Sequence, residues 1–245
     1  MMNFAALHTR LRPILTPTRV AFFASLILSF AAWMTSTINR DGMLYVDTAR
    51  IFLDQGFAAA KASFQWPFIS IFIALSAKLT GLPLEAAGYL MNALFMAGAS
   101  AFLVATASRS NPPAAWAICL VALTLPGVNE YRNELLREFG CWFFIMAAFW
   151  LAYRWADRLT WITGIAIQAT IGFAALFRPE AVAMIPALIA WQLQSAPKRQ
   201  KIRRALMIGS LSVLGLVSLL ALFLAGTLND WNRIGTELAR FSSAK

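Results

Sequence analysis

The chain has 245 residues, of which 60% are hydrophobic and only 13% charged, and its mean hydropathy is +0.64. These values exclude an ordinary soluble domain, which needs a larger polar surface, and indicate a polytopic membrane protein. The net charge of +10 is therefore interpreted as membrane topology and not as nucleic-acid binding. The only histidine is His8, and Cys119 and Cys141 both lie in apolar runs, which argues against histidine catalysis, a His/Cys metal site and a disulfide.

Charge-poor apolar runs predict an all-α transmembrane helical bundle with about seven spans. A membrane-spanning helix needs about 20 mostly apolar residues, and in lipid it satisfies its own backbone hydrogen bonds. The predicted spans are 20–38, 86–107, 112–127, 139–155, 159–177, 181–196 and 205–226. The shorter apolar run at 62–77 is placed with interfacial helices in a first outer loop, 39–85. We expect one transmembrane domain over 1–245, with a cytoplasmic N-terminus (1–19), an outer C-terminal tail (227–245) and no cleavable signal peptide.

Basic residues set the predicted orientation. The N-terminal segment carries Arg10, Arg12 and Arg19 and no acid, which places it in the cytoplasm and predicts a multi-pass protein of the inner (plasma) membrane. If 64–77 stays in the interface, the basic run 198–204 also falls inside. Ten of the eleven carboxylates then lie outside. They either form a polar working surface or merely keep the outer loops soluble.

Polar residues in the predicted outer loops are the candidates for chemistry. Glu130, Glu134 and Glu138 recur every four residues and are expected to share one helical face, with Arg137 beside Glu134. Glu138 directly precedes an apolar run, where an ionised group usually faces a cavity or a partner. The candidates form three clusters along the chain: Arg40, Asp41 and Tyr45; Arg132, Arg137 and Glu138; and Arg178 and Glu180.

Two structural interpretations compete with chemistry at these positions. Pro179 suits the first turn of a helix, and Glu180 suits the positive end of that helix, so capping alone explains Glu180. An Arg137–Glu138 or Arg178–Glu180 pair could equally serve only as an anchor for helix ends. A guanidinium at Arg178, near the outer boundary, is nevertheless a natural partner for a phosphate.

Taken in order, these motifs resemble the membrane-embedded C-type glycosyltransferases. The resemblance is carried by the Arg-Asp-Gly-x-x-Tyr-x-x-x-Ala pattern from Arg40, the Trp66-Pro67-Phe68 segment, the Arg137-Glu138 pair that opens a span and the Arg178-Pro179-Glu180 turn. This superfamily includes the protein O-mannosyltransferases and the lipid A aminoarabinose transferases. The resemblance covers roughly residues 20–195, the N-terminal part of such enzymes.

The resemblance implies sugar transfer from a polyprenyl-phosphate donor to an acceptor on the outer face. Asp41 would act as the base or would position the acceptor, and Glu138 would be the second-loop acid. Arg178, Arg137 or Arg132 would contact the donor phosphate, with Arg40, Tyr45 and Glu180 also lining the substrate site. No cofactor is expected other than the donor, and a divalent metal stays open.

Two other functions stay open at this stage. One is a non-catalytic subunit of a glycan-assembly complex, and the other is a transporter or flippase for lipid-linked glycans, although a transporter predicts ionisable residues at mid-membrane. The expected partners are membrane lipid and the lipid-linked sugar, a second membrane protein stays open, and no nucleic acid is expected.

Overall fold

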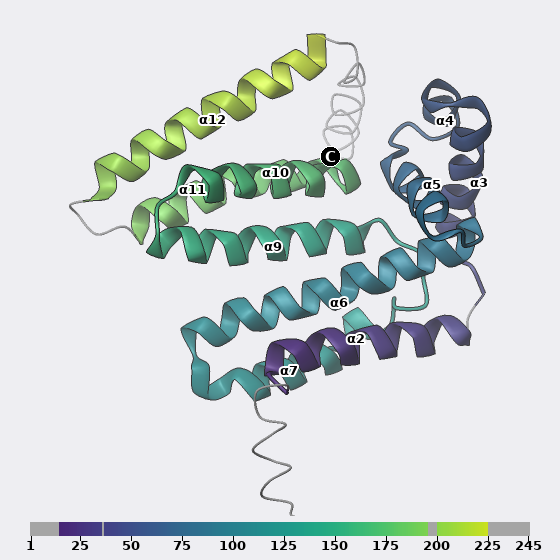
Figure 1. The fold of residues 1–245 in the computed structure, drawn as a ribbon, viewed down its shortest axis with the longest axis horizontal. Coiled ribbons are helices and arrows are strands. Elements are labelled where there is room, and N and C mark those ends of the chain that lie inside the picture. Colours follow the sequence, from purple (N-terminus) through teal and green to yellow (C-terminus); the bar gives the residue numbers. More distant parts are fainter. Residues whose placement is uncertain (1–14, 36, 196–199, 225–245) are drawn as a thin grey trace, which may run out of the picture. The chain divides into compact units, whose positions relative to one another are not determined.

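The computed structural model describes residues 15–35, 37–195 and 200–224. Within these ranges the chain is helical and contains no strand, so the predicted all-α class is confirmed (Figure 1). The chain divides into two compact parts, residues 1–190 and 191–245. The prediction of one domain over the whole chain stays a prediction. The predicted outer tail, 227–245, and most of the predicted cytoplasmic segment, 1–19, lie outside the described residues.

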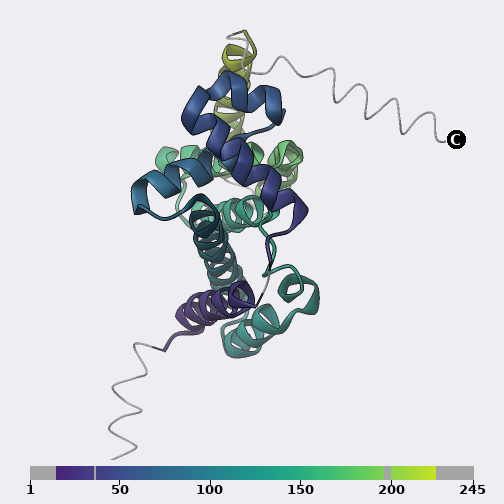
Figure 2. The same cartoon turned by 90° about the vertical axis from the view of Figure 1, so that its right-hand side faces the viewer.

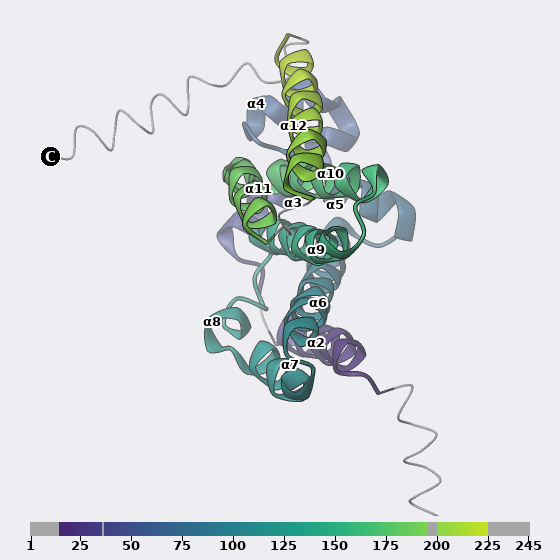
Figure 3. The same ribbon diagram turned by 90° about the vertical axis from the view of Figure 1, so that its left-hand side faces the viewer.

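The first part of the chain contains a row of four long helices. Helix α2 packs against α6, α6 against α9, and α9 against α10, and α7 packs against α2 and α6. Figure 3 shows the row nearly end-on, in the order α10, α9, α6, α2. The bounds are Pro17–Met34 for α2, Leu84–Ser110 for α6, Ala115–Thr124 for α7, Glu138–Asp157 for α9 and Trp161–Phe177 for α10.

Three shorter helices, which we call the cap, lie across one set of ends of the helices in this row. The cap consists of α3 (Arg40–Gln55), α4 (Phe57–Ser63) and α5 (Phe68–Thr80), and Figure 2 looks onto it. Helix α5 packs on α3, α6 and α10. Its 13 residues extend about 20 Å at 1.5 Å per residue, which is too short for a hydrocarbon core of about 30 Å. The cap thus occupies the predicted loop 39–85 without adding a span.

Three of the described helices are long and apolar enough to cross a membrane: α2, α6 and α9. Helix α10 has 17 residues, at the lower limit of the usable range. The predicted span 112–127 is instead broken into a 3₁₀ turn (Pro112–Ala114), α7 and the short α8 (Pro126–Asn129). Pro126 explains the break, because proline forces the preceding Leu125 into an extended conformation and cannot continue the helical hydrogen bonds.

In the second part of the chain, α12 (Lys201–Leu224) begins within the basic run 198–204. Arg204 is buried there and donates to both the backbone carbonyl and the side-chain oxygen of Gln192, at 3.3 and 3.0 Å. Gln192 belongs to α11 (Met184–Gln194), which follows a 3₁₀ turn at Pro179–Ala183. One member of the predicted cytoplasmic basic cluster is therefore used within the protein, and residues 196–199 lie outside the description.

Glycines allow the row of helices to pack closely. A Cβ atom added at Gly140 of α9 would lie 2.5 Å from the ring of Phe177 in α10, and one added at Gly98 of α6 would lie 2.4 Å from the ring of Phe143 in α9. Small residues at helix contacts are the usual means of close packing in membranes, where no hydrophobic effect drives helices together.

We predict that Gly140→Ala destabilises the protein by about 1–3 kcal/mol, because the added methyl group overlaps the buried Phe177 ring. Gly172→Ala is the matched control, since Gly172 also lies in a helix but has open space at its Cβ position. The control should be neutral or slightly stabilising, owing to the higher helix propensity of alanine. Thermal unfolding in detergent measures both variants, and equal midpoints would contradict the packing described.

Candidate active site

The segment that precedes α9 is not helical. The predicted helical face of Glu130, Glu134 and Glu138 is therefore wrong, because residues 130–137 form turns and irregular backbone and α9 begins only at Glu138. Side chains from other elements form hydrogen bonds with backbone N–H and C=O groups that would be paired with one another in a helix. The Asn39 Oδ1 atom accepts a hydrogen bond from the N–H of Leu135 at 3.1 Å, and Asn92 of α6 donates to the carbonyl of Leu136 at 3.1 Å.

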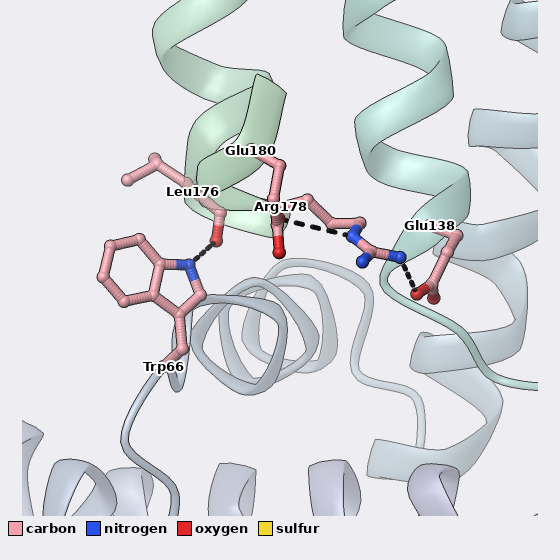
Figure 4. A network of polar contacts seen from close by, with 5 residues as sticks. All are labelled: Trp66, Glu138, Leu176, Arg178 and Glu180. Atoms are coloured by element: carbon pink, nitrogen blue, oxygen red, sulfur yellow. Dashed lines mark hydrogen bonds and ion pairs between the residues drawn. The ribbon is translucent and has the colours of Figure 1, made fainter. Parts of the chain in front are cut away.

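Glu138 meets Arg178 across the helix ends. The Arg178 Nη1 atom lies 2.8 Å from the Glu138 carboxylate, and its Nε atom lies 3.5 Å from the carboxylate of Glu180 (Figure 4). Arg178 directly follows α10 in an extended conformation, which the following Pro179 favours. The proposed Arg178–Glu180 anchor is present, and the Arg178–Glu138 pair was not anticipated from the sequence.

The charges of this group affect one another. Partial burial lowers the pKa of Arg178, but the carboxylates of Glu138 and Glu180 outweigh it and raise that pKa above its ordinary value. Burial raises the pKa of Glu180, whereas its own backbone N–H and the charge of Arg178 lower it, with a net lowering. Arg178 is therefore a permanent cation between two acids, with about a third of its side chain exposed.

The cap fixes the end of α10 beside Arg178. The Trp66 indole N–H donates to the carbonyl of Leu176 at 2.8 Å, which satisfies one of the carbonyls that every helix leaves unpaired at its C-terminus (Figure 4). Phe72 of α5 stacks on Phe177, with ring centroids 5.1 Å apart. In the sequence, Trp66 stood out only as part of the Trp66-Pro67-Phe68 segment, but in the structure it joins the cap to α10.

Tyr45 is packed in the hydrophobic core, against the ring of Phe64, and is subject to the charges of the predicted clusters. It is buried in α3, and burial, as the largest effect, raises the pKa of its hydroxyl to about 12. The charges of Arg137, Asp41, Glu138 and Arg178 also act on this hydroxyl, the arginines lowering its pKa and the acids raising it. The three predicted clusters thus come close enough to influence one phenol. At neutral pH this hydroxyl stays protonated and is a hydrogen-bond donor, not a base.

The remaining predicted site residues are placed differently. Arg40 and Asp41 are exposed in the first turn of α3, and neither makes an ion pair with a described residue. Arg132, in contrast, is 5% exposed. Its Nη1 atom donates to the carbonyl of Ser25 and to the hydroxyls of Ser25 and Ser29, at 2.9–3.1 Å, and its Nε atom donates to Asn129 at 2.6 Å.

Arg132 therefore ties the segment to α2 and makes none of its hydrogen bonds with the charged group around Tyr45. Ser25 lies about 13 Å from the end of α2 at Met34, at 1.5 Å per residue, so the guanidinium reaches well below that end. Its Nη2 atom is buried and has no partner among the described residues. A buried guanidinium at this depth is costly and is retained only where polar groups surround it.

The comparisons with known proteins give the family. A model of the dolichyl-phosphate-mannose-protein mannosyltransferase family matches residues 60–224, more than half of the chain. The chain belongs to this family. No curated protein and no solved structure matches it. The resemblance to C-type glycosyltransferases is thus confirmed, and membership makes the chain an integral membrane glycosyltransferase of the kind that uses a polyprenyl-phosphate sugar donor.

The matched range includes Trp66, Glu138 and Arg178, whereas Asp41 and Tyr45 precede it. The roles of these residues stay predictions. Among the described residues, no group of three or more His, Cys, Asp or Glu side chains gathers as a metal site.

Sequence reasoning missed three residues that build this region: Asn39, Asn92 and Leu135. Asn39 carried a usable signal, because an asparagine before a helical pattern is a favoured N-cap. Leu135 is fully buried, but two adjacent leucines between charged residues gave no periodic pattern. Asn92 is a lone amide in an apolar run, and only the tertiary structure shows that it binds Leu136.

We predict that Arg132→Gln lowers the thermal midpoint in detergent by several degrees, because it removes charge-assisted hydrogen bonds worth about 1.5–3 kcal/mol each. Arg137→Gln is the matched control from the same segment, since Arg137 is only half-buried and has no ion pair with a described residue. The control should keep the wild-type midpoint within about 2 °C. A midpoint that is lowered equally in both variants would contradict the structural role of Arg132.

Proposed function

We propose that this protein transfers a sugar from a polyprenyl phosphate to an acceptor hydroxyl at the outer face of the inner (plasma) membrane, within the charged group at the cap. The observation that carries this proposal is the position of Arg178. Its guanidinium contacts the carboxylates of Glu138 and Glu180, and its charge, like those of Asp41 and Arg137, acts on the Tyr45 hydroxyl. Displacement of a phosphate by a hydroxyl requires a carboxylate to accept the hydroxyl proton and a cation to stabilise the departing phosphate, and both kinds of group are present here.

The charge distribution supports the orientation. The end of the row opposite the cap carries Arg19, Arg109, Arg154 and Arg158, with Asp157 as the acid there, paired with Arg109. Seven carboxylates lie in or beside the cap: Asp41, Asp47, Asp54, Glu85, Glu134, Glu138 and Glu180. Lysines and arginines occur at both ends of the row, but the segment before α2 carries Arg10, Arg12 and Arg19 and no acid, which favours a cytoplasmic N-terminus and therefore an outward-facing cap.

Arg178 is the best of the three candidate arginines for the donor phosphate. A guanidinium has five N–H donors, and the two ion pairs of Arg178 use Nη1 and Nε. Its other N–H groups contact no other polar group among the described residues. Arg137 stands beside Glu138 and can assist, whereas Arg132 is committed to α2. Glu138 and Glu180 hold the Arg178 fork in one orientation.

Asp41 is the proposed base. The acceptor hydroxyl oxygen attacks the anomeric carbon of the sugar, and its proton passes to the Asp41 carboxylate. The bond between that carbon and the phosphate oxygen breaks, and its electron pair leaves with the polyprenyl phosphate, where Arg178 stabilises the charge. Tyr45 donates a hydrogen bond to the substrate, because its raised pKa keeps the phenol neutral. Arg40, exposed beside Asp41, can approach the lipid phosphate from the membrane side.

We predict that Asp41→Asn lowers kcat for sugar transfer by about 10²–10⁴, the usual contribution of a general base. Asp47→Asn is the matched control, because Asp47 lies on the same helix but forms an exposed ion pair with Arg50 at 3.1 Å. Transfer from a polyprenyl-phosphate sugar is measured in proteoliposomes with radiolabelled donor. Equal turnover of the two variants would contradict the role of Asp41.

We predict that Arg178→Gln lowers kcat/KM by about 10²–10³, the loss expected when one preorganised charge donor is removed. Arg178→Lys should restore part of this loss, since it keeps the charge without the planar fork. The double variant Arg178→Gln/Glu138→Gln controls for the Glu138 carboxylate that loses its partner, and it should still be inactive. A value of kcat/KM within about threefold of wild type in the Arg178→Gln single variant would rule out phosphate binding at this position.

The same assay separates the alternative functions. A flippase would move the lipid-linked sugar across the bilayer without consuming it. A subunit of a glycan-assembly complex would show activity only with a membrane protein partner.

A further inference from the structure

Asn39 bridges the two segments that carry the proposed carboxylates. It caps α3, two residues before Asp41, and its Oδ1 atom accepts a hydrogen bond from the N–H of Gly42 at 3.2 Å. The same oxygen accepts from the N–H of Leu135 at 3.1 Å, three residues before Glu138. One amide oxygen therefore fixes the start of the cap and the segment that leads into α9.

The NH₂ group of the Asn39 side chain also forms a hydrogen bond. Its Nδ2 atom donates to the Glu134 carboxylate at 3.4 Å. An asparagine satisfies all of these contacts, because its amide both accepts and donates. An aspartate would keep the cap and the bond from Leu135, but it would place one carboxylate against another.

The bridge has no room to adapt. A Cβ atom added at Gly42 would lie 2.5 Å from Asn39 Oδ1 and 3.0 Å from the Cβ atom of Leu135. The Leu135 side chain is fully buried, and a Cβ atom added at Gly88 of α6 would lie 2.5 Å from it. The contact between the two segments is therefore close-packed, and a change in the Asn39 side chain must displace one segment relative to the other.

We propose that Asn39 is a positioning residue for the transfer reaction, setting the separation between Asp41 on the cap and the Glu138–Arg178 pair on the helix bundle. This inference rests on the proposed function. Asn39 acts through the two segments and not through contact with substrate. Because a misplacement of about 1 Å between reacting groups can cost about 10²-fold in rate, a single amide at this junction can control turnover.

The decisive experiment exchanges the donor and the acceptor of the hydrogen bond between Asn39 and Glu134. Asn39→Asp should lower kcat for sugar transfer by about 10- to 100-fold, while KM for the donor changes by less than about threefold, because Arg178, the proposed phosphate contact, lies outside both displaced segments. The double variant Asn39→Asp/Glu134→Gln restores a donor opposite an acceptor, with the direction of the hydrogen bond reversed. It should recover kcat to within about threefold of wild type. Asn111→Asp is the matched control, at an exposed asparagine at the other end of α6, and should be neutral.

Hydrogen–deuterium exchange on the same proteins tests the coupling independently of turnover. Asn39→Asp should increase exchange in both 40–45 and 130–138, and the double variant should restore protection in both. Unchanged kcat in Asn39→Asp, or a double variant that regains protection without regaining kcat, would overturn the inference. Wild-type protein that transfers no sugar would contradict the proposed function instead, and the exchange pattern alone would then decide whether Asn39 couples the two segments.

Discussion

The non-helical segment between α8 and α9 depends on side chains that take over its backbone hydrogen bonds. Irregular backbone inside a membrane bundle is tolerated only when its polar groups are satisfied within the protein. Asn39 and Asn92 bind the backbone of Leu135 and Leu136, and Arg132 binds α2 below its end. This segment ends at Glu138, so the hydrogen bonds that stabilise the segment also fix the position of the Glu138 carboxylate.

The second requirement is that the cap and the end of α10 stay together. Trp66 supplies the hydrogen bond, and the stacked rings of Phe72 and Phe177 supply the apolar contact. Arg178 follows immediately, so its guanidinium leaves the helix at a fixed point and reaches Glu138. The ion pair between Glu138 and Arg178, the cap bound to the end of α10 and the hydrogen-bonded segment before α9 together fix the arrangement of these charged groups.

The buried arginine shows how the same residue type serves two purposes in one chain. Arg132 and Arg178 both follow a helical segment and both stood as candidates for a phosphate. Arg132 is surrounded by serine hydroxyls and carbonyls and is almost fully buried, whereas Arg178 keeps about a third of its side chain exposed beside two acids. The difference lies in burial and in hydrogen-bond partners. Arg132 is buried against α2 and has a structural role, whereas Arg178 is exposed enough to bind a ligand.

The sequence by itself determined the helical membrane class, the positions of the long helices and the family resemblance, because apolar runs of about 20 residues have one stable solution in lipid. It also indicated that acids and arginines would gather at the cap. It wrongly predicted a helix over Glu130–Glu138, since a spacing of four residues cannot reveal that Asn39 and Asn92 bind the backbone there. Only the tertiary structure decided that Glu138 meets Arg178 and that Arg132 does not join them. Those contacts join residues 40 to 107 positions apart, and no local pattern encodes hydrogen bonds over such separations.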